Sequence, residues 1–202
     1  MSDIGVRIAL CRWAGEGRIC KKMRLVQGAA MKTLPSIGFG PAHGYLYIHA
    51  APKSVLKNLE WGVAEVLKSP LAMKWEPQPL ASGSYRSEIS WNGLQETGSK
   101  LVSNLKGWHY ITFELFESPN NGSDGSLYMF TPDLGLFRGT VGPHGDLMFN
   151  ENQIQKILDE NLRTVTVLDS LETLMGKKWD EVLNPFRHVA MGGEELSARL
   201  SV

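Results

Sequence analysis

The chain has 202 residues, of which 43% are apolar and 21% are charged, and its 21 basic side chains balance its 21 acidic ones. This is the composition of an ordinary globular protein, and the length is sufficient for one sizeable hydrophobic core. No apolar run approaches the roughly eighteen residues of a membrane-spanning helix, so we expect no span and no membrane contact.

The neutral total hides an uneven distribution of charge. Residues 1–43 carry seven basic side chains against two acidic ones, whereas the remaining chain carries 14 basic and 19 acidic side chains and is net −5. Binding to nucleic acid requires clustered Lys and Arg that neutralise phosphates. An acidic domain of this kind therefore disfavours nucleic acid as a partner.

The two cysteines, Cys11 and Cys20, both lie in the basic N-terminal part. Their spacing matches no zinc motif, and two thiols cannot form a disulfide framework. This usage is typical of a reducing compartment, and we expect a cytoplasmic protein.

Residues 1–43 show neither helical nor strand periodicity and contain several glycines as well as Pro35 and Pro41. Three interpretations remain open: a disordered basic extension, an over-long start with translation beginning at Met23 or Met31, and a transit peptide. The Arg-rich and acid-poor composition fits the third, but we favour the first two. Whether residues 1–30 are translated is not decided by the sequence.

Six patterns follow one another between Gly44 and Glu117, in the order strand, helix, strand, strand, helix, strand. Alternation of apolar and polar residues predicts the strands, and recurrence at helical spacing predicts the helices. The expected strands are Tyr45–Ala50, Leu71–Trp75, Ser84–Trp91 and His109–Glu117, and the expected helices run from Pro52 to Lys68 and from Thr97 to Gly107. This order predicts an α+β fold of the ferredoxin-like, split β-α-β type.

The rest of the chain predicts additions to this unit. Two apolar runs, Ser126–Thr131 and Leu134–Val141, are joined by the turn residues Pro132 and Asp133 and predict an appended β-hairpin. C-terminal helices are expected from Glu151 and within residues 168–184. We therefore expect one domain over residues 44–187 and a frayed tail over residues 188–202.

In a ferredoxin-like sheet both helices cover one face. If Leu46 and Ile48 point toward the helices, the other face receives a mixture of aromatic and charged side chains: Tyr45, Tyr47, His49, Arg86, Glu88, Tyr110, Glu114 and Phe116. RNA-recognition domains stack bases on such a face, but the two glutamates and the acidic charge disfavour RNA here. We expect instead that the hairpin and the C-terminal helices cover this face.

Three histidines are the strongest candidates for chemistry. His49 ends the first strand, His109 begins the fourth, and His144 precedes Asp146 in a Gly-Pro-His-Gly-Asp loop. If the loop returned to the sheet edge, three imidazoles and a carboxylate would suit zinc or iron, although none of the spacings is a metal motif. Paired carboxylates such as Glu88 with Asp146 have no local signature for acid–base catalysis either.

Seven motifs, spread over residues 44–187, carry a resemblance to a known family: Gly44–Pro52, Leu59–Ala64, Gly107–His109, Thr131–Phe137, Gly142–Asp146, Leu174–Asp180 and Asn184–Arg187. Together they resemble the actinobacterial family catalogued as domain of unknown function 3145. The resemblance implies a cytoplasmic actinobacterial protein, and it implies no functional residue.

The function expected from the sequence is binding of a protein or a small molecule rather than catalysis, and no cofactor is predicted. The candidate binding surface combines His49 and Pro52 with Trp108 and His109 and with the His144–Asp146 loop. The alternative is a metal-dependent enzyme that uses His49, His109, His144 and Asp146. A homo-oligomer is compatible with either.

Overall fold

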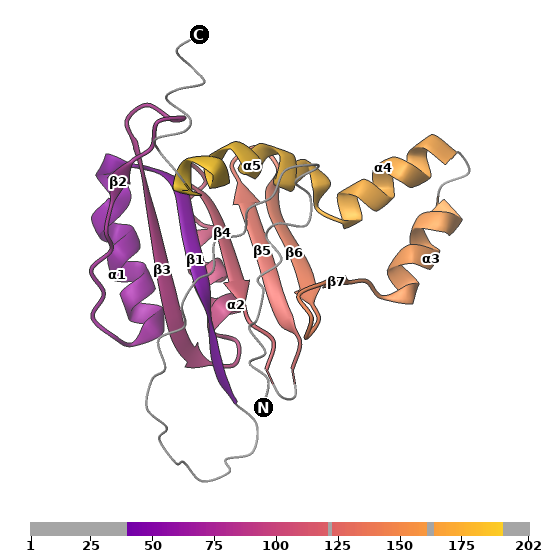
Figure 1. Cartoon of the computed structure of the whole chain (residues 1–202), viewed down its shortest axis with the longest axis horizontal. Helices are drawn as coiled ribbons and strands as arrows, with labels where there is room; N and C mark the ends of the chain where they lie inside the picture. The colour runs from indigo at the N-terminus through magenta and orange to yellow at the C-terminus, as the bar shows by residue number, and fades with distance from the viewer. Residues whose placement is uncertain (1–39, 121–122, 161–163, 192–202) are drawn as a thin grey trace.

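The computed structural model describes residues 40–120, 123–160 and 164–191. Within them the fold is mixed α+β, with one antiparallel sheet of seven strands in the order β2-β3-β1-β4-β5-β6-β7 (Figure 1). The strands are β1 Pro41–Pro52, β2 Glu76–Pro77, β3 Ser84–Leu94, β4 Thr112–Glu117, β5 Gly125–Thr131, β6 Gly135–Val141 and β7 Leu147–Met148. The helices are α1 Leu56–Leu67, α2 Thr97–Leu105, α3 Glu151–Glu160, α4 Thr164–Leu174 and α5 Lys177–Met191, with a short 3-10 helix, η1, at Lys53–Val55.

Strand β1 lies inside the sheet, between β3 and β4, and pairs antiparallel with both. Because successive side chains of a strand point to opposite faces, the alternation in β1 decides which face each residue serves. Leu46 and Ile48 are buried in the main core together with Leu59 of α1 and Leu101 of α2. Tyr45, Tyr47 and His49 therefore point to the opposite face.

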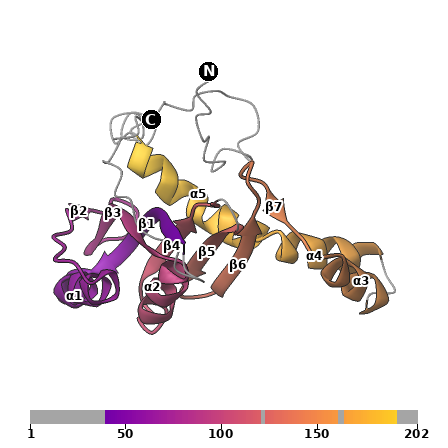
Figure 2. The same ribbon diagram turned by 90° about the horizontal axis from the view of Figure 1, so that it is seen from below.

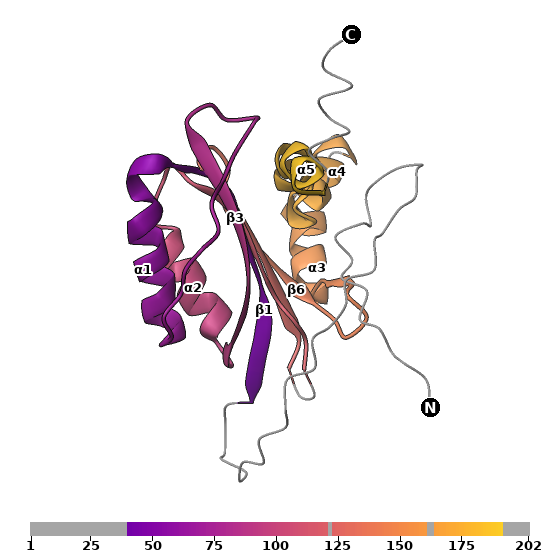
Figure 3. The same ribbon diagram turned by 60° about the vertical axis from the view of Figure 1, so that its left-hand side comes forward.

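Helices α1 and α2 cover the first face side by side (Figure 3). Proline at position 52 precedes the helical turn of η1. Helix α1 ends at Leu67, and the left-handed φ of 53° at the following Lys68 turns the N–H of Ser69 back to the carbonyl of Ala64. The two helices approach closely at Gly62, where an added Cβ would lie 2.6 Å from Oδ1 of Asn104. The side chain of Asn104 therefore packs directly on the backbone of α1 at this point.

Helix α5 lies on the opposite side of the sheet from α1 and α2 and crosses the second face near one end (Figures 1 and 3). Leu183 of α5 is fully buried against Met129 of β5 and Phe137 of β6, and the Trp179 indole donates to the carbonyl of Gly135 at 2.9 Å. The appended hairpin β5-β6 does not fold over this face as expected. It pairs with the free edge of β4 and widens the sheet.

Several boundaries differ from the sequence prediction. Strand β4 begins at Thr112, so His109 and Tyr110 lie in the connection before it and not on the sheet face. Residues 71–75 are not a strand, because the N–H of Met73 and the indole of Trp75 both donate to Glu60 of α1 and draw the segment onto the helix. The second strand is only β2, at Glu76–Pro77. At the C-terminus α5 continues through Met191, past the predicted end of the domain, and residues 192–202 lie outside the described part.

Strand β1 starts at Pro41, three residues before the expected beginning of order, and residues 1–39, with their alternative interpretations, lie outside the described part. No helix in the described ranges is long and apolar enough to span a bilayer.

A substitution at Gly44 tests the tight packing of β1 against β4. A Cβ at this position would lie 1.9 Å from the backbone oxygen of Phe116 and 2.8 Å from the Trp91 ring. We expect Gly44→Ala to destabilise the fold by about 2 kcal/mol or more, since backbone cannot yield as a flexible side chain does. Urea unfolding measures this, with Gly40→Ala as the control, because nothing lies within 4 Å of a Cβ there. Equal stability of the two variants would contradict the packing.

Candidate functional site

A buried carboxylate, Glu114 of β4, lies at the centre of a polar cluster on the second face. Only 2% of its side chain is exposed. The His49 ring donates from Nε2 to Oε2 at 2.7 Å, and Arg187 of α5 donates from Nε to the same oxygen at 3.0 Å. Arg187 also bonds Oε1 of Glu114 through Nη2 and bonds Asp180 through Nη1. The cluster thus joins β1, β4 and α5.

Three local features of the chain bring these groups together. Tyr47 pairs with Glu114 in the β1–β4 register, so His49, two residues further along β1, shares the face of Glu114. Asp180 and Arg187 are seven residues apart on α5, which is two helical turns and therefore one face of the helix. Apolar packing of Leu183, between them in sequence, holds that face against the sheet.

The electrostatics of the cluster follow from its partners. Burial by itself raises the pKa of Glu114, but the hydrogen bonds and charges of His49 and Arg187 outweigh burial and lower the pKa to about 2. For Arg187, burial opposes the charge, but Glu114 and Asp180 raise the guanidinium pKa above its usual value. Both groups are therefore ionised at neutral pH.

A row of rings leads from this cluster toward the surface. The rings of Tyr45 and Tyr47, and those of Tyr47 and His49, stack at 6.3 Å between centroids. Tyr47 bonds Glu88 on the neighbouring strand, and burial together with the charge of Glu88 raises the pKa of the phenol. Because His49 and Glu114 are only 4% and 2% exposed, a substrate has no direct access to the ionised pair.

The predicted histidines occupy different parts of the molecule. His109 is exposed in the connection from α2 to β4, close to Trp108, whose indole packs against the α1–α2 core. His49 points to the other face and is buried against Phe186 of α5. Pro52 ends β1 at the start of η1.

The loop with His144 and Asp146 is not brought to His49. Strand β1 has its last residues beside the start of β4, and the hairpin register places the start of β6 at this same end. Strand β6 therefore ends, and its loop to β7 begins, at the opposite end of the sheet. In the described ranges no three His, Cys, Asp or Glu side chains lie close enough to hold a metal ion.

A groove on the helix face was not predicted from the sequence. At one end a pocket of about 330 Å³ is lined by Asn58, Trp61 and Gly62 of α1 and by Asn104 and Trp108. None of these five residues is charged. Trp61 is 71% exposed, more than any other large apolar residue in the described part. The Trp108 ring meets the ring of Tyr110, itself half exposed, edge to face at 6.2 Å.

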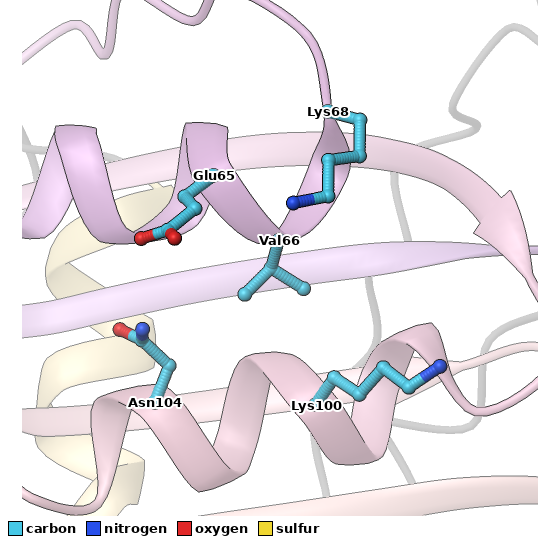
Figure 4. A pocket seen from close by; sticks show the side chains of 5 residues that line it. All are labelled: Glu65, Val66, Lys68, Lys100 and Asn104. Carbon is cyan, nitrogen blue, oxygen red and sulfur yellow. The ribbon is translucent and has the colours of Figure 1, made fainter.

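A second pocket of about 320 Å³ lies further along the same two helices (Figure 4), and we call the two pockets together the groove. Its lining residues are Glu65, Val66 and Lys68 of α1 and Lys100 and Asn104 of α2. Asn104 borders both pockets, so they are neighbours. Lys100 lies 3.9 Å from Glu96 and is well exposed. The groove is therefore neutral and aromatic at one end and charged at the other.

One signal in the sequence pointed to the groove. Trp61 falls outside the apolar stripe of its helix, which runs through Leu59, Val63 and Val66, so helical geometry places a large indole on the solvent side. Nothing in the sequence pointed to Arg187, because it is 73 residues away from its partner Glu114.

The sequence profile of a family described as "Protein of unknown function (DUF3145)" matches residues 45–197. Searches of curated proteins and of solved structures give no match.

Replacing Glu114 tests the buried ion pair. Glu114→Gln leaves Arg187 buried without its main countercharge, and we expect a loss of about 3 kcal/mol in the free energy of unfolding, measured with urea. Glu160→Gln is the control, since Glu160 is 63% exposed and its ion pair with Lys156 is weak. In a double variant with Arg187→Met the loss should be smaller than the sum of the single losses. Strict additivity would contradict a direct interaction.

The lowered pKa of Glu114 also predicts how stability depends on pH. A carboxyl whose pKa falls from 4.5 unfolded to about 2 folded contributes stability that is fully present above pH 4.5 and is lost as the pH falls toward 2. We expect about 3 kcal/mol of acid-sensitive stability from this group. The slope of stability against pH below 4.5 should be steeper for the wild type than for Glu114→Gln. Parallel slopes would show that Glu114 titrates normally.

Proposed function

The chain belongs to the DUF3145 family, and we propose that it is a non-catalytic binding domain that holds an extended peptide segment of a partner protein in the groove between α1 and α2.

The observation that carries this proposal is the exposed indole of Trp61. Large aromatic side chains are the most frequent energetic anchors of protein interfaces, and burying one in a complex removes a large apolar area from water. Trp61 lies beside a pocket that also contains Trp108 and two side-chain amides. An apolar residue of a peptide would fill this pocket, and Asn58 and Asn104 offer donors and acceptors for the peptide backbone.

The length of the groove favours an extended ligand over a compact one. From Asn58 to Lys68 helix α1 advances about 15 Å, at 1.5 Å per residue. An extended chain covers that distance with about five residues. Two connected pockets at this spacing suit two side chains of one peptide.

The charges at the two ends of the groove favour a different type of peptide residue at each end. The aromatic pocket has no charged lining residue, so it favours an apolar side chain. The other pocket contains Lys68 and Lys100 against Glu65, which favours an acidic residue. The proposal keeps Trp108 and the neighbouring His109 from the predicted surface and leaves out His49, Pro52, His144 and Asp146.

The proposal also includes the type of fold and the location of the protein in the cell. The order β2-β3-β1-β4 with both helices on one face supports a ferredoxin-like unit, extended by the strands β5 to β7 and the C-terminal helices. The cysteine usage supports a cytoplasmic location, and the acidic charge of residues 44–202 disfavours nucleic acid as the ligand.

Selection from a displayed library of random peptides tests the groove. The wild-type chain should enrich peptides that combine an apolar residue with an acidic one about four positions away. The affinity of an enriched peptide, measured by fluorescence titration, should fall at least about tenfold in Trp61→Ala, because the anchor ring is lost.

Leu158→Gln, in the distant helix α3, is the control and should bind as the wild type does. Enriched peptides that bind Trp61→Ala with unchanged affinity would overturn the proposal, as would a selection that enriches no peptide.

A further inference from the structure

Helices α3 and α4 form an arm that projects from the sheet beyond β6 and β7 (Figures 1 and 2). The two helices pack on each other, and α4 packs on α5. The arm is held at its base by Gly176, between α4 and α5, where φ is 74° and an added Cβ would lie 2.7 Å from the Phe137 ring. The base is therefore fixed to the sheet, while the arm itself stands away from it.

Helix α3 exposes apolar residues that a helix of the core would bury. None of its ten residues is buried, and Ile154 and Leu158, four residues apart on one face, are 39% and 51% exposed. Isolated helices shorter than about twelve residues are marginal in water, and most helical stability comes from packing an apolar face. The apolar face of α3 therefore resembles one of the two surfaces that form a protein–protein interface.

The charge of the arm indicates what kind of surface would cover it. Residues 151–174 contain five acidic side chains and two basic ones, a net charge of −3. Two of the acids belong to pairs within α3: Asp159 accepts from Gln155, and Glu160 lies 3.7 Å from Lys156. Of the others, Glu151 lies in the first turn of α3 and Asp169 on α4, while Glu172 forms an ion pair with Lys177 of α5. A second copy of the arm would bring the same negative charge and would be repelled.

We propose that the α3–α4 arm is a second interaction surface, which binds a basic amphipathic helix of another protein. The apolar face of that helix packs on Ile154 and Leu158, and its Lys and Arg side chains meet the acids of the arm. Packing of one helix against two is the arrangement of helical bundles, and the projecting arm leaves room for it. The surface is separate from the α1–α2 groove.

A designed peptide tests the proposal on the full chain. It has about eighteen residues, with Leu at helical spacing and Lys at the exposed positions, and a matched peptide carries Glu in place of Lys. The Lys peptide should bind and become helical by circular dichroism, and the Glu peptide should bind at least about a hundredfold more weakly. Leu158→Gln, which removes an apolar side chain without changing charge, should weaken the Lys peptide about tenfold.

Two controls separate this surface from others. Leu94→Gln, at a leucine of β3 that is 61% exposed, and Trp61→Ala, in the groove, should bind the Lys peptide as the wild type does. Equal binding by Leu158→Gln and the wild type would overturn the proposal, because attraction to an acidic protein in general would then explain it. Sedimentation of the wild type as a dimer that Leu158→Gln dissociates would also overturn it, in favour of a second copy.

Discussion

The ion pair between Glu114 and Arg187 ties helix α5 to the interior of the sheet, and through Glu114 it also reaches His49 of β1. The apolar contacts of α5 are few, with Leu183 as its fully buried residue against Met129 and Phe137, and apolar packing alone has little directional preference. Glu114 is inside the sheet and is bonded from β1 by His49 and from α5 by Arg187. Burying these charges is costly, and the cost is offset only in the arrangement in which every partner is in place. The pair therefore selects one position of α5 more than it adds stability.

The two faces of the sheet are stabilised by different kinds of interaction. On the first face, α1 and α2 bury a continuous apolar core, and the side chain of Asn104 packs directly on the backbone of α1 at Gly62. On the second face, the strand registers place Glu88, Tyr47 and Glu114 side by side, followed by the apolar Met129 and Phe137. Such a row cannot form a purely apolar core, so it is completed by a helix that brings its own charge, Arg187. The aromatic sheet face is thus closed at the α5 end by an ion pair.

Much of the fold could be predicted from the sequence because local periodicity carries it. The alternation at Tyr45–Ala50 and the stripe through Leu59 and Val63 predict β1 and α1, and the Pro132-Asp133 turn predicts the β5–β6 hairpin. The prediction at residues 71–75 was wrong because Glu60, on a helix, takes the N–H of Met73 that a strand would use. The ion pair joins residues 73 positions apart, and the alternative metal site required the loop with His144 to return to the sheet edge at His49. Both the ion pair and the position of the His144 loop depend on which strands pair across the sheet, and no local sequence pattern encodes that pairing.

The two proposed surfaces depend on the ion pair between Glu114 and Arg187 to different degrees. The α1–α2 groove is built on the main apolar core, and neither Glu114 nor Arg187 lines it. The α3–α4 arm is attached through Gly176 to α5, so its position follows that of α5 and hence of Arg187. Protonation of Glu114 as the pH falls toward 2 removes the countercharge of Arg187, which lies on the helix that carries the arm. A domain assembled in this way carries a rigid site on its core and a second surface whose placement depends on one buried carboxylate.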